Sequence, residues 1–244
     1  AFARNRGGNQ TLTDTTVANF QAGSGDCYTA PSAGNDFDGE LILSPTLGVT
    51  FTGTTLPSGW YSGTYGAGGA VTVSNGLLTA AGAFAATSDP TYPPSRTLEF
   101  SATFGALLKE HVGLTGSPDL NTGPWAIFST GSIGDQLYAR TSNEPQPATD
   151  TPLGSAYLGT AHRYRIEWTN TSIIYSIDGI AVVTHTSPLI PDAMRVIVSS
   201  VDPANNLVVD WLRMGSYAKS CSFQSRVFDA GQAAAYMQLA AWEL

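Results

Sequence analysis

The stretch that decides the fold is HRYRIEWTNTSIIYSIDGIAVV, residues 162–183. Tyr164, Ile166 and Trp168 alternate with charged or polar residues, which is the period-2 pattern of a strand with one buried face and one wet face. The polar tetrapeptide at 169–172 and a later Asp-Gly pair are turn signals. This stretch therefore predicts three antiparallel strands in a meander.

The rest of the chain continues the same pattern on both sides of the meander. Short β-branched or aromatic runs are separated by Gly, Pro, Asn and Asp turns. Such runs occur at 39–43, 70–73, 97–104 and 125–128. We expect an all-β protein in which two antiparallel sheets pack face to face. Trp125, Trp168 and Trp211 are expected in the core between them, with Tyr164 and Ile166.

The amino-acid composition of the chain limits the classes of molecule that it could bind. Only 12% of the 244 residues are charged, about half the usual share, and the net charge is −8. An acidic chain offers no basic stripe to phosphates, so nucleic acid is excluded as a partner. Anionic membrane surfaces are disfavoured for the same reason, and no apolar run is long enough for membrane insertion. Low charge with abundant Gly, Thr, Ser and Ala is typical of an extracellular or cell-surface β-protein.

Two segments carry a resemblance to a known family. YRIEW at 164–168 with the following IIYSIDG resembles the signature of laminarinase-like glycoside hydrolases (family 16-like), within the concanavalin A-like lectin/glucanase group. The segments 194–198 and 209–214 are similar to the closing strands of that family. The resemblance implies a concanavalin-like antiparallel jelly-roll sandwich. We place it at 35–217, between extended β-type arms at 1–34 (N-terminal) and 218–244 (C-terminal).

The same resemblance bears on catalysis. Family enzymes carry a strand with the pattern Glu-x-Asp-x-x-Glu, which provides the two carboxyl groups of a retaining mechanism. The strand expected at that place, 124–130, contains no carboxylate. We therefore expect no catalytic residues and no enzyme activity. The acidic cluster with Asp36, Asp38 and Glu40 could be a displaced acid pair, a weak Ca²⁺ site through Asp36 and Asp38, or an ordinary turn; no other cofactor is implied.

Aromatic residues are the best candidates for contact with a glycan. Trp60, Tyr61 and Tyr65 lie in a loop rich in Gly, Pro and Ser. Exposed aromatic faces stack on sugar rings, so this loop is a candidate lectin-like site. In the alternative interpretation, Trp60 plugs one end of the sandwich.

The histidines and cysteines are candidates for metal ligands and for a crosslink. His111, His162 and His185 lack metal-ligand spacing. His162 and His185 could face each other across the meander and form a site, but polar residues on a wet face are the favoured interpretation. Cys27 and Cys221 could be free buried thiols or a disulfide. Their positions near the two ends of the sandwich favour the disulfide.

The two ends of the chain suggest a further possibility. Both arms have strand-forming sequence, and an unpaired strand tends to pair with another chain. Candidate contacts of such an assembly are Phe20, Phe228, Tyr236, Met237, Leu239 and Trp242.

Three functions follow from these features. The first is a non-catalytic structural or adhesive subunit that forms homo-oligomers or filaments through its arms. The second is a glycan-binding module, and the third is a polysaccharide hydrolase or lyase with displaced acids.

Overall fold

The computed structural model describes residues 2–4, 11–31, 39–88, 91–117, 120, 122–132, 134–204, 207–227 and 238–239. The chain divides into two compact units, one formed by residues 1–46 with 217–244 and the other by residues 47–216. Among the described residues, no helix has both the length and the apolar character needed to cross a membrane. The predicted boundaries at 34/35 and 217/218 stay a prediction.

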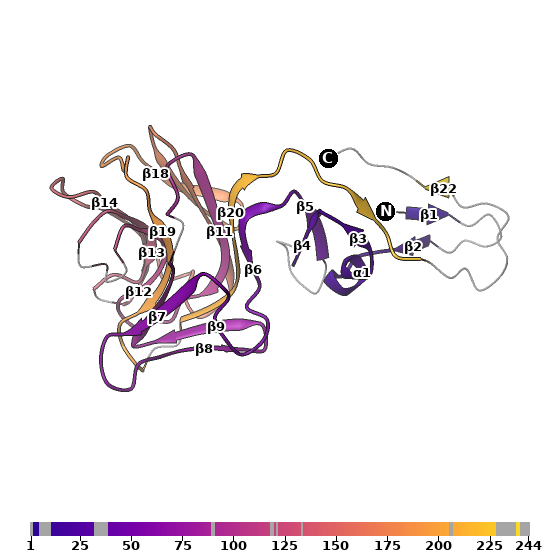
Figure 1. Cartoon of the computed structure of the whole chain (residues 1–244). Coiled ribbons are helices and arrows are strands. Elements are labelled where there is room, and N and C mark those ends of the chain that lie inside the picture. The colour runs from indigo at the N-terminus through magenta and orange to yellow at the C-terminus, as the bar shows by residue number, and fades with distance from the viewer. Residues whose placement is uncertain are drawn as a thin grey trace. The chain divides into compact units, whose positions relative to one another are not determined.

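Residues 47–216 form a sandwich of two antiparallel sheets, which make its two layers (Figure 1). One sheet has seven strands in the order β15 (Thr149–Gly154), β14 (Leu137–Ser142), β13 (Trp125–Ser129), β12 (Glu110–Thr115), β19 (Arg195–Ser200), β10 (Ala83–Thr87) and β7 (Trp60–Thr64). The other has eight strands: β18 (Ile180–His185), β17 (Ile173–Ile177), β16 (His162–Trp168), β11 (Arg96–Thr103), β20 (Leu207–Tyr217), β9 (Leu77–Ala81) and β8 (Ala70–Ser74), with β6 (Pro45–Val49) paired to β20. The all-β sandwich predicted from sequence is confirmed.

The predicted meander is β16, β17 and β18. Tyr164 pairs with Ile177 and Trp168 with Ile173, and β17 continues into β18 through the Asp-Gly turn. Tyr164, Ile166 and Trp168 are fully buried, as their alternation predicts. The indole Nε1–H of Trp168 also donates to the carbonyl of Ile190 at 3.0 Å, so this buried donor is satisfied.

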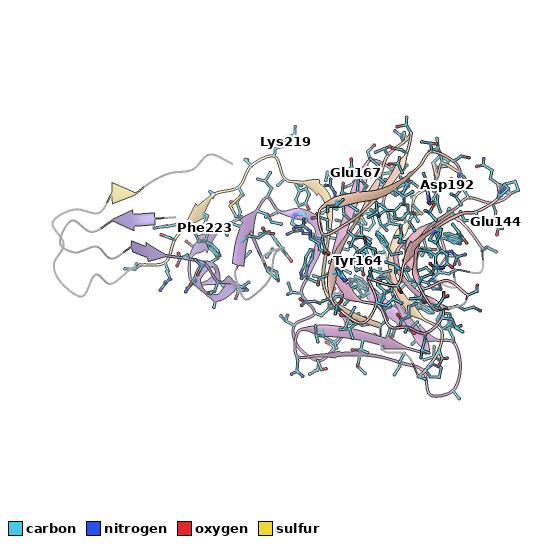
Figure 2. All side chains as sticks on the ribbon, turned by 180° about the vertical axis from the view of Figure 1, so that it is seen from behind. Glu144, Tyr164, Glu167, Asp192, Lys219 and Phe223 are labelled. Carbon is cyan, nitrogen blue, oxygen red and sulfur yellow. A yellow bond between two sulfur atoms is a disulfide. The ribbon has the colours of Figure 1, made fainter. Side chains whose placement is uncertain are left out.

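An aromatic cluster around Tyr164 joins the two sheets. The Tyr164 ring stacks on Phe100 of its own sheet, with centroids 5.3 Å apart, and contacts Phe128 of the seven-stranded sheet at 4.9 Å. Phe104 and Tyr175 complete the cluster through Tyr164 and Phe128 respectively. Figure 2 shows Tyr164 among the side chains between the layers. Aromatic pairs add about 0.5–1.5 kcal/mol each beyond the burial of their area, so this cluster is a main source of sheet-to-sheet cohesion.

Two of the three predicted core tryptophans lie elsewhere. Trp211 is buried but does not belong to the core cluster, because β20 has an irregular register between Ser101 and Ala102 of its partner β11. The extra residue reverses the alternation, so Trp211 lies on the opposite face from Val209 and packs under the Arg213 guanidinium, 4.8 Å from its ring centroid. Trp125 is also outside the core cluster. Both residues are buried, as predicted, but on the outer side of their sheets and not between the sheets.

Two histidines expected on a wet face are buried instead. His185 bridges the sheets: its Nδ1 shares a hydrogen bond with Thr141 at 2.8 Å and its Nε2 with Thr151 at 2.9 Å. Burial lowers its pKa. His111, in the seven-stranded sheet, is 6% exposed. In both cases hydroxyl partners compensate for the loss of water, which the sequence does not reveal.

The smaller unit contains short elements of both chain ends. The helix α1 (Val17–Gln21) begins at Thr16, whose hydroxyl accepts from the Asn19 amide. The strands form the pairs β4 (Tyr28–Pro31) with β5 (Gly39–Ile42) and β3 (Ser24–Gly25) with β21 (Phe223–Gln224), and a sheet of β2 (Thr11–Thr13), β1 (Phe2–Arg4) and β22 (Gln238–Leu239). Cys27 and Cys221 form a disulfide with Cα atoms 4.9 Å apart, which confirms the predicted bridge.

One acidic side chain lies inside the sandwich. Glu110, at the start of β12, has no exposed surface, and its Oε2 accepts from the Gly105 amide while Oε1 has no hydrogen-bond partner. Burial raises the pKa of this carboxyl to about 7, although the Gly105 hydrogen bond opposes the shift. Glu110 is therefore a pH-dependent element of stability.

We predict that Glu110→Gln stabilises the sandwich at high pH but not at low pH. Between the ordinary carboxyl pKa and about 7 the unfolded chain ionises while the folded chain holds its proton, so wild-type stability falls as pH rises through this window. The variant should gain up to about 3 kcal/mol over wild type at pH 8 and little at pH 4. Urea unfolding at both pH values measures this, with exposed Glu144→Gln as the control. An equal effect at the two pH values would contradict the prediction.

Candidate functional site

The seven-stranded sheet turns one set of side chains away from the core. Along each strand, residues such as Val112 and Phe128 belong to the core cluster, and the residues between them point to the opposite side. We call this side the outer face. Its members are Tyr61, Phe84, Ala86, His111, Gly113, Thr115, Trp125, Ile127, Ser129, Tyr138, Arg140, Ser142, Asp150, Arg195, Ile197 and Ser199.

Strand pairing aligns these side chains in three rows across the sheet. The first row is Tyr138, Ser129, His111, Ser199 and Phe84. The second is Asp150, Arg140, Ile127, Gly113, Ile197, Ala86 and Tyr61. The third is Ser142, Trp125, Thr115 and Arg195. With neighbouring strands about 4.8 Å apart, the second row extends about 29 Å, longer than any single sugar ring.

The first row is polar at its centre. The Nδ1 of His111 and the Ser129 hydroxyl share a hydrogen bond of 2.8 Å, and the Gly131 amide donates to the same hydroxyl at 2.8 Å. On the next strand, Ser199 shares a hydrogen bond of 2.8 Å with the Tyr65 hydroxyl. Burial, reinforced by the positive charges of Arg140 and Lys109, lowers the pKa of His111 to about 3, so its ring is neutral at physiological pH.

Aromatic rings lie at both ends of the rows. On one side Phe84 contacts Tyr61 and Tyr65, with ring centroids 5.8 and 5.7 Å apart. On the other side the half-buried Tyr138 accepts a hydrogen bond from Gln136 at 2.8 Å. Rings with an apolar face and a polar hydroxyl are suited to hydroxylated apolar ligands such as sugars.

An ion pair occupies the β14–β15 edge of the face. The Arg140 guanidinium donates to both carboxylate oxygens of Asp150 at 2.9 Å, and it lies 5.0 Å from the ring centroid of Trp125. This bidentate pair fixes the arginine over the indole. Trp125 is buried although it lies on the outer face, because the Arg140 guanidinium covers its ring.

The structure separates the three aromatic residues predicted to contact a glycan. Tyr61 and Tyr65 contribute to the outer face through their contacts with Phe84 and Ser199. Trp60 instead packs against the core, with its ring 5.9 Å from that of Phe51. We therefore leave Trp60 out of the candidate site.

Carboxylates are sparse on this face. The expected acid-free strand is β13, and among the described members of the outer face Asp150 is the carboxylate. Glu144 follows β14 in an exposed turn and appears at the periphery of the sandwich with Asp192 (Figure 2). Glu110 points inward and lies outside the candidate site. The described residues contain no cluster of three or more His, Cys, Asp or Glu that could hold a metal ion.

Several predicted residues lie outside the described residues. These are the weak Ca²⁺ candidates Asp36 and Asp38 and the assembly candidates Phe228, Tyr236, Met237 and Trp242. Leu239 pairs through its backbone with Ala3. Phe20 contacts Phe223 within the smaller unit, with ring centroids 6.0 Å apart.

Sequence reasoning missed most of the outer face, including His111, Tyr138, Arg140 and Arg195. Each is a polar or aromatic residue that alternates with apolar residues in its strand, and this alternation was the available signal. The alignment of separate strands into rows requires the sheet register, which the sequence alone does not provide.

Solved structures share the fold of the sandwich, and two of those described here are glucanases. A Bacillus licheniformis β-glucanase matches with a TM-score of 0.53 and 13% identity, covering 70% of this chain and 97% of that chain. An endo-β-1,3-glucanase from Pyrococcus furiosus matches at 0.52 and 14%, covering 74% and 95%. An immunostimulatory antigen and pseudo β-1,3-glucanase of Mycobacterium tuberculosis matches at 0.53 and 14%, covering 71% and 100%. No family model and no curated protein sequence matches the chain.

These matches correct two predictions. The non-catalytic structural or adhesive subunit assembling through its arms, and the expectation that the chain is not an enzyme, are both contradicted, because proteins of this fold include a β-glucanase and an endo-β-1,3-glucanase. The activities named belong to those proteins. At 13–14% identity, what the matches establish for this chain is its architecture. It has the concanavalin-like jelly-roll sandwich of laminarinase-like, family 16-like glycoside hydrolases.

Proposed function

We propose that this protein binds an extracellular polysaccharide across the outer face of its seven-stranded sheet and hydrolyses it. The observation that carries the proposal is the set of aligned rows. Half-buried aromatic residues lie toward both sides of the rows, and the polar groups at the centre, the His111–Ser129 pair and Ser199, are buried and hydrogen-bonded within the protein. A polymer has repeated rings and hydroxyls, so it can use contacts on several strands at once.

The side chains of the outer face indicate which chemical class of ligand it would bind. Half-buried Tyr61, Phe84 and Tyr138 offer partly accessible rings on three different strands. Hydroxyl groups outnumber charges in the rows, which favours a hydroxylated ligand over a protein or nucleic acid. The disulfide suits an oxidising compartment, which supports an extracellular location.

Hydrolysis is supported by the fold shared with glucanases and by the position of Asp150. A glycosidase needs two carboxyl groups, about 5–5.5 Å apart for retention or about 6.5–9.5 Å for inversion. Asp150 is on the outer face, and Glu144 is the acid closest to it in sequence, in the turn between β14 and β15. We assign these two as the candidate pair.

For binding, we predict that the double variant Tyr61→Ala with Tyr138→Ala weakens affinity for a bound polysaccharide by at least about tenfold, because each substitution removes an apolar ring from the face. Affinity electrophoresis against laminarin, mixed-linkage glucan and acidic polysaccharides provides the measurement. Ile174→Ala, a half-buried position in the eight-stranded sheet, is the control and should leave affinity unchanged. Unaltered binding by the double variant would exclude the outer face as the binding surface.

For hydrolysis, we predict that Asp150→Asn and Glu144→Gln each lower the release of reducing ends by at least about 100-fold. The exposed Asp192→Asn variant is the matched control. Affinity is measured in parallel, because Asp150→Asn also removes the ion pair with Arg140. If wild-type protein binds a polymer and releases no reducing ends, the hydrolase assignment fails and the binding assignment stands.

A further inference from the structure

Arg195 is an arginine of the outer face with unused hydrogen-bonding capacity. It lies at the start of β19, between the core residues Met194 and Val196. One terminal nitrogen, Nη1, is 3.4 Å from the Tyr61 hydroxyl, 3.4 Å from the Thr87 carbonyl and 3.3 Å from the Ser88 carbonyl. These distances exceed the usual N–H···O range. Its Nε is buried and has no hydrogen-bond partner.

The charge of Arg195 is also uncompensated. Across the described part of the chain, the ion pairs of Arg140, Arg165, Arg213 and Arg226 are with carboxylates, and Arg195 takes part in none. Arg140, the other arginine of the outer face, is neutralised by both oxygens of Asp150. A half-buried guanidinium without an anion is costly, and a buried Nε–H without an acceptor adds to that cost. An anionic group supplied from outside would compensate the charge of the guanidinium.

The neighbours of Arg195 are groups that suit a sugar. Tyr61 is adjacent through its hydroxyl, and Thr115 occupies the paired position on β12. Trp125 follows Thr115 in the same row. A sugar ring held against Tyr61 would therefore place a substituent within reach of the guanidinium.

We propose that the polysaccharide bound on the outer face is anionic, and that Arg195 receives a carboxylate or sulfate group of the sugar. This inference rests on the proposed function and specifies its substrate class. The terminal N–H groups of the planar guanidinium can donate to the oxygens of such an anion, whereas the buried Nε–H is not accessible to a ligand. The net charge of −8 opposes unspecific adsorption of an acidic polymer, so binding must come from a local contact of this kind.

The test compares three polymers by affinity electrophoresis: neutral laminarin, polygalacturonate and a sulfated carrageenan. Wild-type protein should bind one of the acidic polymers at least about tenfold more tightly than laminarin, and the preferred polymer identifies carboxylate or sulfate as the anion. Arg195→Gln should abolish this preference, so that the variant binds the acidic polymer no more tightly than it binds laminarin. Arg195→Lys, which retains the charge without the planar guanidinium, should keep only part of the preference.

Arg165→Gln is the matched control, since Arg165 lies in the eight-stranded sheet and pairs with Glu167 at 2.8 Å. It should retain the wild-type preference. Circular dichroism verifies the fold of each variant, and if Arg195→Gln does not fold, the Arg195→Lys result decides. Equal binding of neutral and acidic polymers, or a preference that survives at Arg195→Gln and Arg195→Lys, would overturn the inference while the proposed function stands. Absence of binding to all polymers would overturn the proposed function and this inference with it.

Discussion

The contact between Tyr164 and Phe128, with ring centroids 4.9 Å apart, joins the two sheets on which the other features depend. Tyr164 belongs to the meander in the eight-stranded sheet, and Phe128 to the middle of the seven-stranded sheet. Because Phe128 is anchored inward, its neighbours Ile127 and Ser129 must point outward. The same alternation on the adjacent strands produces the outer face. The core thus determines which side chains are available to a ligand.

On the outer side of each sheet an arginine covers a tryptophan, but the seven-stranded sheet also carries a further arginine, Arg195, with a different environment. On the seven-stranded sheet Arg140 covers Trp125, and on the eight-stranded sheet Arg213 covers Trp211. Each of these arginines has a carboxylate partner, Asp150 and Glu99 respectively. Arg195 differs because it combines a buried unpartnered donor with an uncompensated charge. This difference makes the seven-stranded sheet the stronger candidate for ligand recognition.

The sequence predicted those features that depend on local pattern. The alternation at 162–168 gave the meander and its buried face, and the positions of Cys27 and Cys221 favoured the disulfide. The predictions from sequence failed for features that depend on the register between paired strands. The irregular pairing near Trp211 reversed a face that alternation alone assigns to the core. The rows around His111 could not be found from sequence because they depend on the register of four to seven strands, and β19 and β10 are distant along the chain from β12.

The most direct test of the outer face as the binding surface is a titration of the tryptophan indole signals by nitrogen–proton NMR. Trp125 and Trp211 are both buried under an arginine, on opposite outer sides of the sandwich, so each serves as the control for the other. Single Trp→Phe variants assign the two signals. On addition of a bound polysaccharide, the Trp125 signal should shift and the Trp211 signal should stay in place. A shift of Trp211 with an unchanged Trp125 would contradict the account.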